Sequence, residues 1–320
     1  MLRYETDIPE PVALEDETIV TVKACALNHL DVWIRRGVPA YQTQLPHILG
    51  CDIAGIDAEG NKVLVNPIVA CGVCRWCLAG RDNLCAKGVV IGAGRPGGYA
   101  ERVAVPKRNL LSIPEGWSWE EAAAFPLVSQ TAWHMLVALA EIEPGESVLV
   151  IGGGSGVGSA AIQIARHKSA SVIATAGNET KRARCVELGA SAAVDHYAED
   201  WAAQAKEANG GKLFDVAFEH VGGHIFEGCL KLLGKGGRLV TCGGTIDAQP
   251  KADVRYLFSR ELTIKGGFIG TKRDLAEALE AARQGGLKPI VSETLPLEKA
   301  QEAHRKIEAG EVFGKIALTL

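Results

Sequence analysis

Four cysteines at close spacing carry the clearest chemistry in this sequence. Cys71, Cys74, Cys77 and Cys85 follow the pattern C-x2-C-x2-C-x7-C. Four soft thiolates at such short intervals can surround one tetrahedral ion, and zinc is the usual occupant. Because four protein ligands leave no position for water or substrate, we predict one structural zinc. An iron–sulfur cluster also uses four thiolates and is the alternative.

A glycine-rich turn predicts a second site, for a nucleotide. Residues 148–151 are a candidate buried strand, 152–158 have the sequence Gly-Gly-Gly-Ser-Gly-Val-Gly, and a helix is expected over 160–165. Strand, turn and helix in this order form the context that a dinucleotide fingerprint requires. Glycine lets the backbone approach a pyrophosphate, whose charge the N–H groups of the helix start attract. The candidate cofactor-binding residues are Gly153, Ser155, Gly156, Val157 and Gly158, with Ser155 at the middle glycine position of the fingerprint.

The end of the next predicted strand, 171–175, indicates which dinucleotide binds. An NAD site usually has Asp or Glu there, which binds the 2′-hydroxyl of the adenosine ribose. Here no carboxylate stands at the strand end, and Asn178 is followed by Lys181 and Arg182. A cationic, acid-free pocket suits a 2′-phosphate, so we predict NADPH as the cofactor. Glu179 keeps NADH as the less favoured alternative, and the basic residues also fit a plain solvated helix face.

Hydrophobic patterning divides the chain into three regions that position these residues. Residues 1–127 contain short alternating apolar runs and are expected to form irregular β structure. Residues 128–267 alternate apolar strands with helical stretches, which is typical of βαβ units and a parallel sheet. Residues 268–320 contain a predicted helix over 273–284 and a final strand over 314–319. We therefore predict an α/β protein.

Composition and charge exclude several classes of protein. Apolar residues make up 47% and charged residues 22% of the 320 residues, a globular balance that is incompatible with intrinsic disorder. The formal net charge of −4 gives no basic footprint for nucleic acid. We see no apolar stretch near the roughly 20 residues of a membrane-spanning helix, and no apolar signal core. With clustered cysteines, these features predict a cytoplasmic protein that binds neither nucleic acid nor membrane.

The cysteine cluster followed by the glycine-rich turn resembles the medium-chain dehydrogenase/reductase superfamily, and the resemblance covers nearly the whole chain. It implies a Rossmann doubly wound parallel-sheet domain, 128–267, that interrupts a GroES-like β-rich catalytic domain, 1–127, to which 268–320 returns. The cofactor is then expected in the cleft between the domains, and the four cysteines form the family's structural zinc site. A homodimer or homotetramer is the expected assembly. Other matching segments are 26–31, 49–55, 97–101, 214–222, 236–240 and 314–316.

The zinc-dependent alcohol dehydrogenases of the family carry a second, catalytic zinc, and this sequence departs from its ligands. Asn28 stands where a Cys is usual, Cys51 and Asp52 replace a His-Glu pair, and the domain junction offers no Cys or acid. Because such a site needs about three protein ligands, we predict no catalytic zinc. His29 and His47 are near enough in sequence to leave an improvised second site as an alternative.

The same pattern, with Asn28 ahead of Asp31, looks like the quinone oxidoreductase branch, whose members use NADPH to reduce quinones or the C=C bond of enones. Hydride addition to a conjugated carbonyl leaves negative charge on its oxygen, which hydrogen-bond donors stabilise without a Lewis acid. Asn28 and Tyr41 are candidate donors, and Thr131 is a third candidate catalytic residue, carried over from the family. A turn-forming role for Asn28 and a plain surface position for Tyr41 are the alternatives.

The resemblance adds cofactor-binding candidates beyond the glycine-rich turn. Tyr197 stands where relatives place an aromatic residue near the adenosine phosphate, and the neighbouring His196 is its alternative. Val221, Cys242 and Gly243 belong to segments that run beneath the nicotinamide end of the cofactor.

Some interpretations stay open. His220, beside these segments, is either a proton relay or a packed loop histidine. A zinc-type alcohol dehydrogenase with altered ligands and a non-catalytic NADPH-binding protein are the rivals of a quinone or enone reductase. Relatives usually begin earlier, with another strand, so either that strand is missing or the start is assigned too late. Together with a short connection over 55–63, this predicts a trimmed catalytic lobe with no strand before Thr18.

Overall fold

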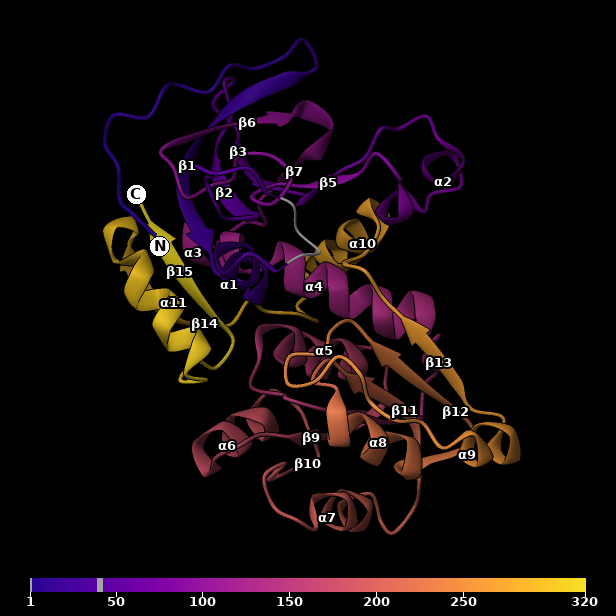
Figure 1. The fold of residues 1–320 in the computed structure, drawn as a ribbon. Coiled ribbons are helices and arrows are strands. Elements are labelled where there is room, and N and C mark those ends of the chain that lie inside the picture. Colours follow the sequence, from indigo (N-terminus) through magenta and orange to yellow (C-terminus); the bar gives the residue numbers. More distant parts are fainter. Residues whose placement is uncertain (1, 39–42) are drawn as a thin grey trace. The chain divides into compact units, whose positions relative to one another are not determined.

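The computed structural model describes residues 2–38 and 43–320, which form two compact units (Figure 1). The first unit contains the described residues up to Leu127, together with Thr271–Leu275 and Pro289–Leu320. The second unit contains Val128–Gly270 and Ala276–Lys288. Residues 268–270 and Ala276–Lys288 therefore belong to the second unit, which differs from the predicted return of the whole segment 268–320 to the first domain.

Helix α10 (Lys272–Arg283) explains this difference. Leu279 and Ala282 on this helix are buried, and the indole nitrogen of Trp133 donates a hydrogen bond of 3.0 Å to Glu277. Both the apolar face of the helix and this hydrogen bond belong to the second unit, which a pattern of helices and strands along the chain does not reveal.

A seven-stranded sheet forms the core of the first unit. Its strands lie in the order β14-β15-β1-β2-β3-β7, with β6 also paired to β1, and only β14 and β15 are parallel neighbours. Residues of strand β1 pack in two clusters, since Val20 and Val22 pack with Ile53 while Ala24 packs with the alanines of helix α3 (Trp119–Ala124). The strands are β1 (Glu17–Ala26), β2 (Asp52–Ile56), β3 (Lys62–Val65), β6 (Arg102–Pro106), β7 (Leu110–Ser112), β14 (Val291–Pro296) and β15 (Lys315–Thr319), with the separate pair β4 (Ile68–Val69) and β5 (Val89–Val90).

Short helices complete this unit, and its N-terminal part is irregular. Residues 2–16 contain no strand, and the connection between β2 and β3 is a tight hairpin. The helices are α1 (His29–Arg36), α2 (Arg75–Leu78), α3 (Trp119–Ala124) and α11 (Ala300–Glu308), with short 3-10 turns η1 (Asp82–Leu84), η2 (Lys107–Asn109) and η4 (Leu297–Lys299).

A six-stranded parallel sheet forms the core of the second unit, in the order β10-β9-β8-β11-β12-β13. Val148, Leu149 and Val150 of β8 are all buried, so both faces of the sheet are covered, as expected for parallel strands with crossover helices. The strands are β8 (Ser147–Val150), β9 (Ser171–Thr175), β10 (Ala192–Val194), β11 (Phe214–Glu219), β12 (Leu233–Thr241) and β13 (Thr263–Gly266). The helices are α4 (Pro126–Trp133), α5 (Gly156–His167), α6 (Glu179–Glu187), α7 (Trp201–Ala208), α8 (Gly223–Leu232) and α9 (Val254–Arg260), with a π-helical turn, η3 (His134–Leu139). The predicted doubly wound parallel sheet is confirmed.

The order of these strands contains one reversal, between β8 and β11. In open parallel sheets, ligands bind outside the carboxyl ends of the strands at such a topological switch point. The glycine-rich turn follows β8, and the segment that begins at His220 follows β11. The fold therefore brings two of the sequence-predicted cofactor segments to the same switch point of the sheet in the second unit.

One helical run, Trp119–Leu139, is long and apolar enough to cross a membrane by length and composition alone. It includes α3, α4 and η3, and 67% of its most apolar window is buried inside the protein, as in the core helix of a globular protein. Because mostly buried runs of this kind also occur in the cores of globular proteins, the prediction that the protein does not bind a membrane stays a prediction.

Candidate functional site

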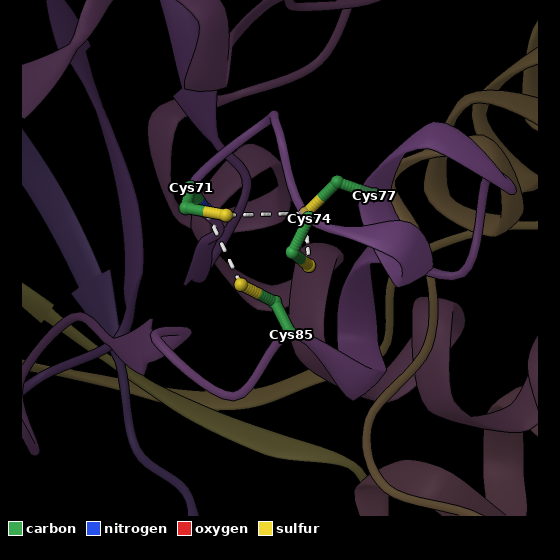
Figure 2. A group of neighbouring side chains, drawn as sticks. All are labelled: Cys71, Cys74, Cys77 and Cys85. Carbon is green, nitrogen blue, oxygen red and sulfur yellow. Dashed lines mark hydrogen bonds between the residues drawn. The ribbon is translucent and has the colours of Figure 1, made fainter.

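The four cysteines of the first unit converge on one point (Figure 2). Their sulfur atoms all lie within 4.8 Å of one another, with 3.9 Å between those of Cys71 and Cys77 and 3.5 Å between those of Cys74 and Cys77. A tetrahedral zinc with Zn–S bonds of about 2.3 Å holds its sulfurs about 3.8 Å apart. The number, chemistry and spacing of the thiols therefore fit a closed zinc site.

Local structure favours the thiolate at Cys71, whereas burial raises the pKa of the Cys77 thiol to about 12. Cys77 lies within α2, and Cys85 follows η1 directly. Backbone N–H groups of Val73 and Cys74 lower the pKa of Cys71 to about 6, which favours the thiolate that a metal needs.

The lobe that carries the cysteines has little apolar packing of its own. Val73 and Leu78 are exposed to 77% and 76%, and the guanidinium groups of Arg75 and Arg81 lie 4.6 and 5.1 Å from the centroid of the Trp76 ring. A bound ion would therefore supply folding free energy that burial does not.

Steric limits explain the glycines of the turn after β8. A Cβ at Gly158 would stand 2.2 Å from the carbonyl oxygen of Gly152, and one at Gly153 would stand 2.8 Å from the Cys185 sulfur. Ser155 caps α5, since its hydroxyl accepts a hydrogen bond of 2.9 Å from the N–H of Gly158. Gly156 and Val157 form the first helical turn, whose N–H groups have no partner inside the helix. The turn is thus built as an anion-binding helix start.

The end of β9 lies beside an aromatic ring and a capped helix. The Asn178 side chain caps α6 by accepting a hydrogen bond of 2.9 Å from the N–H of Lys181. A Cβ at Gly177 would stand 2.4 Å from the ring of Tyr197, so this ring lies against the strand end. Lys181 is partly buried, and that burial lowers its pKa. Asn178, Lys181 and Tyr197 are therefore gathered around one strand end, as the predicted adenosine pocket requires.

This pocket is not free of acids, however. Arg182 forms an ion pair with Asp195, with 2.9 Å between Nη1 and Oδ2. Asp195 follows β10, which pairs in parallel with β9, so both strands end at the same edge of the sheet. The sequence-based description of an acid-free pocket is wrong on this point, because the acid arrives from the neighbouring strand rather than from the end of β9.

A buried carboxylate organises the segment after β11. Glu219 accepts hydrogen bonds from the N–H groups of Val221 and Gly222 and lies 3.2 Å from the hydroxyl of Thr241, at the end of β12. Its burial raises its pKa. Cys242 and Gly243 follow Thr241 directly, and burial raises the pKa of the Cys242 thiol to about 12. The three candidates Val221, Cys242 and Gly243 thus meet at the carboxyl edge of the sheet.

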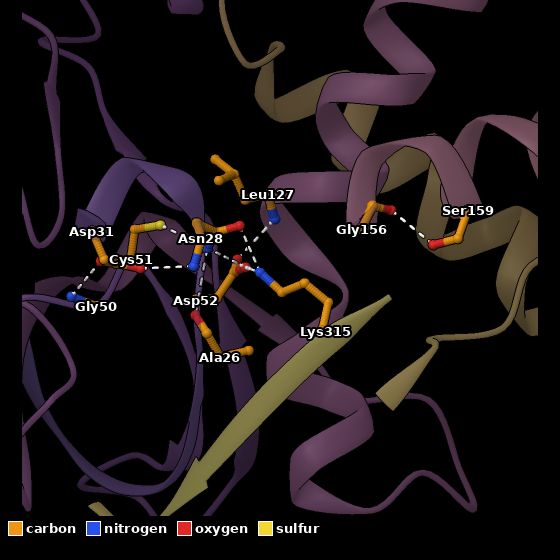
Figure 3. Close-up of polar contacts among 10 residues, drawn as sticks. All are labelled: Ala26, Asn28, Asp31, Gly50, Cys51, Asp52, Leu127, Gly156, Ser159 and Lys315. Carbon is orange, nitrogen blue, oxygen red and sulfur yellow. Dashed lines mark hydrogen bonds and ion pairs between the residues drawn. The ribbon is translucent and has the colours of Figure 1, made fainter. Parts of the chain in front are cut away.

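A buried polar cluster surrounds Asn28 in the first unit (Figure 3). Asn28 precedes α1, Asp52 begins β2 and Lys315 begins β15, and the three residues are exposed to 6%, 0% and 4%. The Lys315 ammonium donates to the Asn28 amide oxygen at 2.5 Å and lies 2.9 Å from Asp52 Oδ2. The other oxygen of Asp52 accepts a hydrogen bond of 2.8 Å from the N–H of Leu127.

The amide nitrogen of Asn28 has one strong and two weak acceptors. It donates to Asp52 Oδ2 at 2.8 Å, while the Cys51 sulfur lies at 3.3 Å and the Ala26 carbonyl oxygen at 3.4 Å. Thiol sulfur is a weak acceptor. One of the two amide protons is therefore held by Asp52, and the other is only weakly engaged.

Burial also governs the neighbouring ionisable groups. It raises the pKa of Asp31 to about 6 and lifts that of the Cys51 thiol well above its ordinary value. Asp31 accepts hydrogen bonds from the N–H groups of Asn28 and Gly50, at 2.8 and 3.0 Å, which partly oppose the effect of burial. Cys51 therefore stays a neutral thiol, and Asp31 fixes the start of α1.

The donor set around Cys51 does not resemble a second zinc site. Within residues 2–38 and 43–320, the four-cysteine cluster is the one group in which three or more His, Cys, Asp or Glu side chains offer converging ligand atoms. His29 and His47 join no such group, and burial lowers the pKa of both. The Lys315 ammonium beside Asp52 would repel a divalent cation there.

The other two predicted catalytic residues are not among the side chains described above. Thr131 is buried on α4, in the second unit. Tyr41 lies outside the described residues.

Two functional candidates were missed by sequence reasoning. The signal for Lys315 was a charged residue at the start of an otherwise apolar strand. Its function could not be predicted because its partners lie far away in the sequence. Glu219 likewise ends an apolar strand, and only the folded loop shows that it holds the N–H of Val221.

Comparisons with known proteins agree with this architecture. Residues 14–115 match the family described as alcohol dehydrogenase GroES-like domain, and residues 156–284 match the family described as zinc-binding dehydrogenase. A quinone oxidoreductase of Pongo abelii is 32% identical over all of this chain and 94% of its own length. An alcohol dehydrogenase of Geobacillus stearothermophilus is 30% identical over 98% of this chain and 94% of its own. A solved NAD-dependent alcohol dehydrogenase is 42% identical, with a TM-score of 0.93 over 98% of this chain and 95% of its own.

Proposed function

The chain belongs to the medium-chain dehydrogenase/reductase superfamily, and from that premise we propose that it is a cytoplasmic, NADPH-dependent reductase of quinones or of the activated C=C bond of enones. It is an enzyme of this superfamily, and the rival interpretation as a non-catalytic binding protein has no support among the full-length relatives. One structural zinc at the four cysteines and the absence of a catalytic zinc belong to the proposal.

The observation that carries the proposal is the position of the Lys315 ammonium between Asn28 and Asp52. A buried carboxylate requires a cation, and here a lysine of the chain itself supplies it. A reaction that needs hydrogen-bond donors, rather than a metal-bound alkoxide, fits such a site.

Asn28 is the residue for which we propose direct contact with the substrate oxygen. When bound, NADPH supplies the hydride, which adds to the β-carbon of an enone while negative charge collects on the carbonyl oxygen. The weakly engaged amide proton of Asn28 is the donor for that oxygen. Lys315 polarises the same amide through its hydrogen bond to Oδ1, which strengthens the donor on Nδ2. A proton from water then completes the saturated ketone and leaves NADP⁺.

The preference for NADPH rests on Lys181, Asn178 and Tyr197 around the end of β9. Arg182 contributes less than the sequence indicated, because Asp195 already neutralises its charge.

Fluorescence titration with NADPH and NADH, on protein of measured zinc content, tests the proposal together with turnover on a quinone and enone panel. We expect tighter binding of NADPH, one zinc per chain, and reduction of at least one panel member. Tighter binding of NADH or two zinc ions per chain would contradict it.

An NAD-dependent alcohol dehydrogenase is the second candidate, because the solved structure that is 42% identical carries that name. Under this alternative the purified enzyme oxidises alcohols with NAD⁺ and holds a second zinc that chelators remove with loss of activity. The two candidates therefore differ in zinc count, cofactor and substrate.

The assembly we propose is a homo-oligomer joined through strand β13. Among the described strands, β13 pairs with β12 alone, which leaves one edge of the sheet without a partner. Ile264 on this strand and Phe258 on α9 are exposed to 38% and 72%. An unpaired edge flanked by exposed apolar side chains is suited to pairing with a second copy of the chain.

A further inference from the structure

Two side chains meet across the switch point of the parallel sheet in the second unit. Ser155 follows β8 and His220 follows β11, the two strands between which the strand order reverses. The His220 Nε2 atom lies 3.2 Å from the Ser155 hydroxyl oxygen, which is within hydrogen-bond distance. Ligands of open parallel sheets bind at such a switch point, so these two side chains stand where a ligand is expected.

The imidazole of His220 also lies against the turn itself. A Cβ at Gly152 would stand 3.0 Å from His220 Nε2, and the Ser155 hydroxyl that faces His220 accepts the hydrogen bond from Gly158 that caps α5. The ring is therefore placed at the start of α5, where the N–H groups of the first turn attract an anion.

The backbone of His220 packs closely against the segment 243–245. Its carbonyl oxygen accepts a hydrogen bond of 3.1 Å from the hydroxyl of Thr245, and Gly243 lies so close that a Cβ there would stand 3.0 Å from the same oxygen. Its neighbour Glu219 holds the N–H of Val221. The residue is nevertheless only partly buried.

We propose that His220 is a ligand of the cofactor's pyrophosphate and that Ser155 positions it. This inference rests on the proposed function only in that the turn binds a dinucleotide. An imidazole N–H donates readily to a phosphate oxygen and adds charge assistance when protonated. Ser155 replaces the middle glycine of the fingerprint, and its hydroxyl holds the His220 ring over the turn. The two residues are therefore expected to act together.

Binding of three probes to His220→Ala distinguishes a ligand of the pyrophosphate from a residue that only maintains the fold of the unit. NADPH and ADP-ribose contain the pyrophosphate, whereas adenosine 2′-monophosphate reaches only the pocket at the end of β9. We expect Kd for NADPH and ADP-ribose to rise about tenfold or more, as for a lost hydrogen bond to a charged group. Kd for adenosine 2′-monophosphate is expected to stay unchanged, and His220→Gln, which keeps a donor, is expected to recover part of the loss.

Two further variants sharpen the test. Ser155→Gly removes the hydroxyl that positions the ring, and we expect a smaller loss of affinity for the same two pyrophosphate probes. His224→Ala removes an exposed histidine of α8 and serves as the matched control with wild-type affinities.

Unchanged or tighter NADPH binding by His220→Ala would overturn the inference, since the ring would then be idle or in the way of the phosphate. An equal loss for all three probes would also overturn it, because the defect would lie in the fold of the unit. Failure of the wild-type protein to bind any dinucleotide is a different result, which overturns the proposed function itself.

Discussion

At the scale of single residues, a buried lysine distinguishes this site. The Lys315 ammonium donates a hydrogen bond to the amide oxygen of Asn28 and forms an ion pair with Asp52, whose carboxylate is fully buried. Removal of one partner of such a pair leaves an uncompensated buried charge and lowers the free energy of unfolding strongly. Replacement of both partners lowers it much less. The cluster can therefore be tested by paired substitutions.

We expect Lys315→Met to lower the free energy of unfolding by about 3–5 kcal/mol, because Asp52 is left buried without a cation. The double variant Lys315→Met/Asp52→Asn should recover a large part of that loss. Urea unfolding of the zinc-loaded protein measures both. A single variant as stable as the wild type would contradict a strongly coupled pair, and recovery of stability without recovery of activity would support the role of Lys315 in polarising Asn28.

Asp31 is expected to give the protein a specific pH dependence. Burial raises its pKa to about 6, against about 3.9 in an unfolded chain, so the folded state binds more protons between these values. Its contribution to stability is present below about pH 4 and is lost as the pH rises towards 6, by about 3 kcal/mol.

Denaturation of the wild type and of Asp31→Asn at a series of pH values measures this slope as a difference. The exposed Asp57, whose pKa is lowered chiefly by a hydrogen bond from Asn61, provides the control variant Asp57→Asn. Because Asp57→Asn still contains Asp31, its stability should fall over the same pH range as that of the wild type. Parallel pH curves for the wild type and Asp31→Asn would exclude the effect.

At the scale of elements, the cysteine lobe and the parallel sheet are held together by different forces. The sheet of the second unit buries continuous apolar strands, such as β8, on both faces. The lobe with α2 and η1 leaves Val73 and Leu78 exposed and brings four thiols together. Metal is therefore expected to matter for the lobe and not for the sheet.

Cys85→Ser is expected to reduce the zinc content from one per chain to near none and to open the segment 71–85 to proteases. Dinucleotide binding by the second unit should persist, since no cysteine of the cluster belongs to that unit. Metal analysis and limited proteolysis measure the two effects. Cys229→Ala, at a core position of α8, is the control and should keep its zinc. Full zinc content in Cys85→Ser would contradict the assignment.

At the scale of the whole molecule, the proposed assembly of several copies of the chain depends on the unpaired edge of β13. Its apolar residue Ile264 alternates with Lys265, whose ammonium donates to the Leu139 carbonyl oxygen at 2.7 Å and is thus tied to the protein itself. The edge is therefore left without the free lysine that commonly prevents edge pairing.

Ile264→Lys is expected to turn the oligomer into a monomer, because a charged side chain at the edge disfavours strand pairing. Light scattering coupled to size-exclusion chromatography gives the mass. Val186→Lys, at an exposed apolar position of α6, is the control and should leave the mass unchanged. A monomeric wild type, or an oligomer that survives Ile264→Lys, would rule out assembly through β13.

Local features of the sequence determined much of this protein. The spacing of Cys71 to Cys85, the glycine-rich turn and the apolar strands each depend on neighbouring residues. The predicted strands 148–151 and 171–175 lie within one residue of β8 and β9. These features are short-range, since thiol spacing, backbone sterics and side-chain periodicity act within a few residues.

Only the tertiary structure decided which distant residues meet. Lys315 donates a hydrogen bond to Asn28, which is 287 positions away in the sequence. Asp195, which follows a neighbouring strand, forms an ion pair with Arg182, and His220 contacts Ser155 across the switch point. None of these pairings follows from periodicity, because strand order and register set them. The physical reason is that a charge or donor in a buried place takes its partner from whatever element the fold puts beside it.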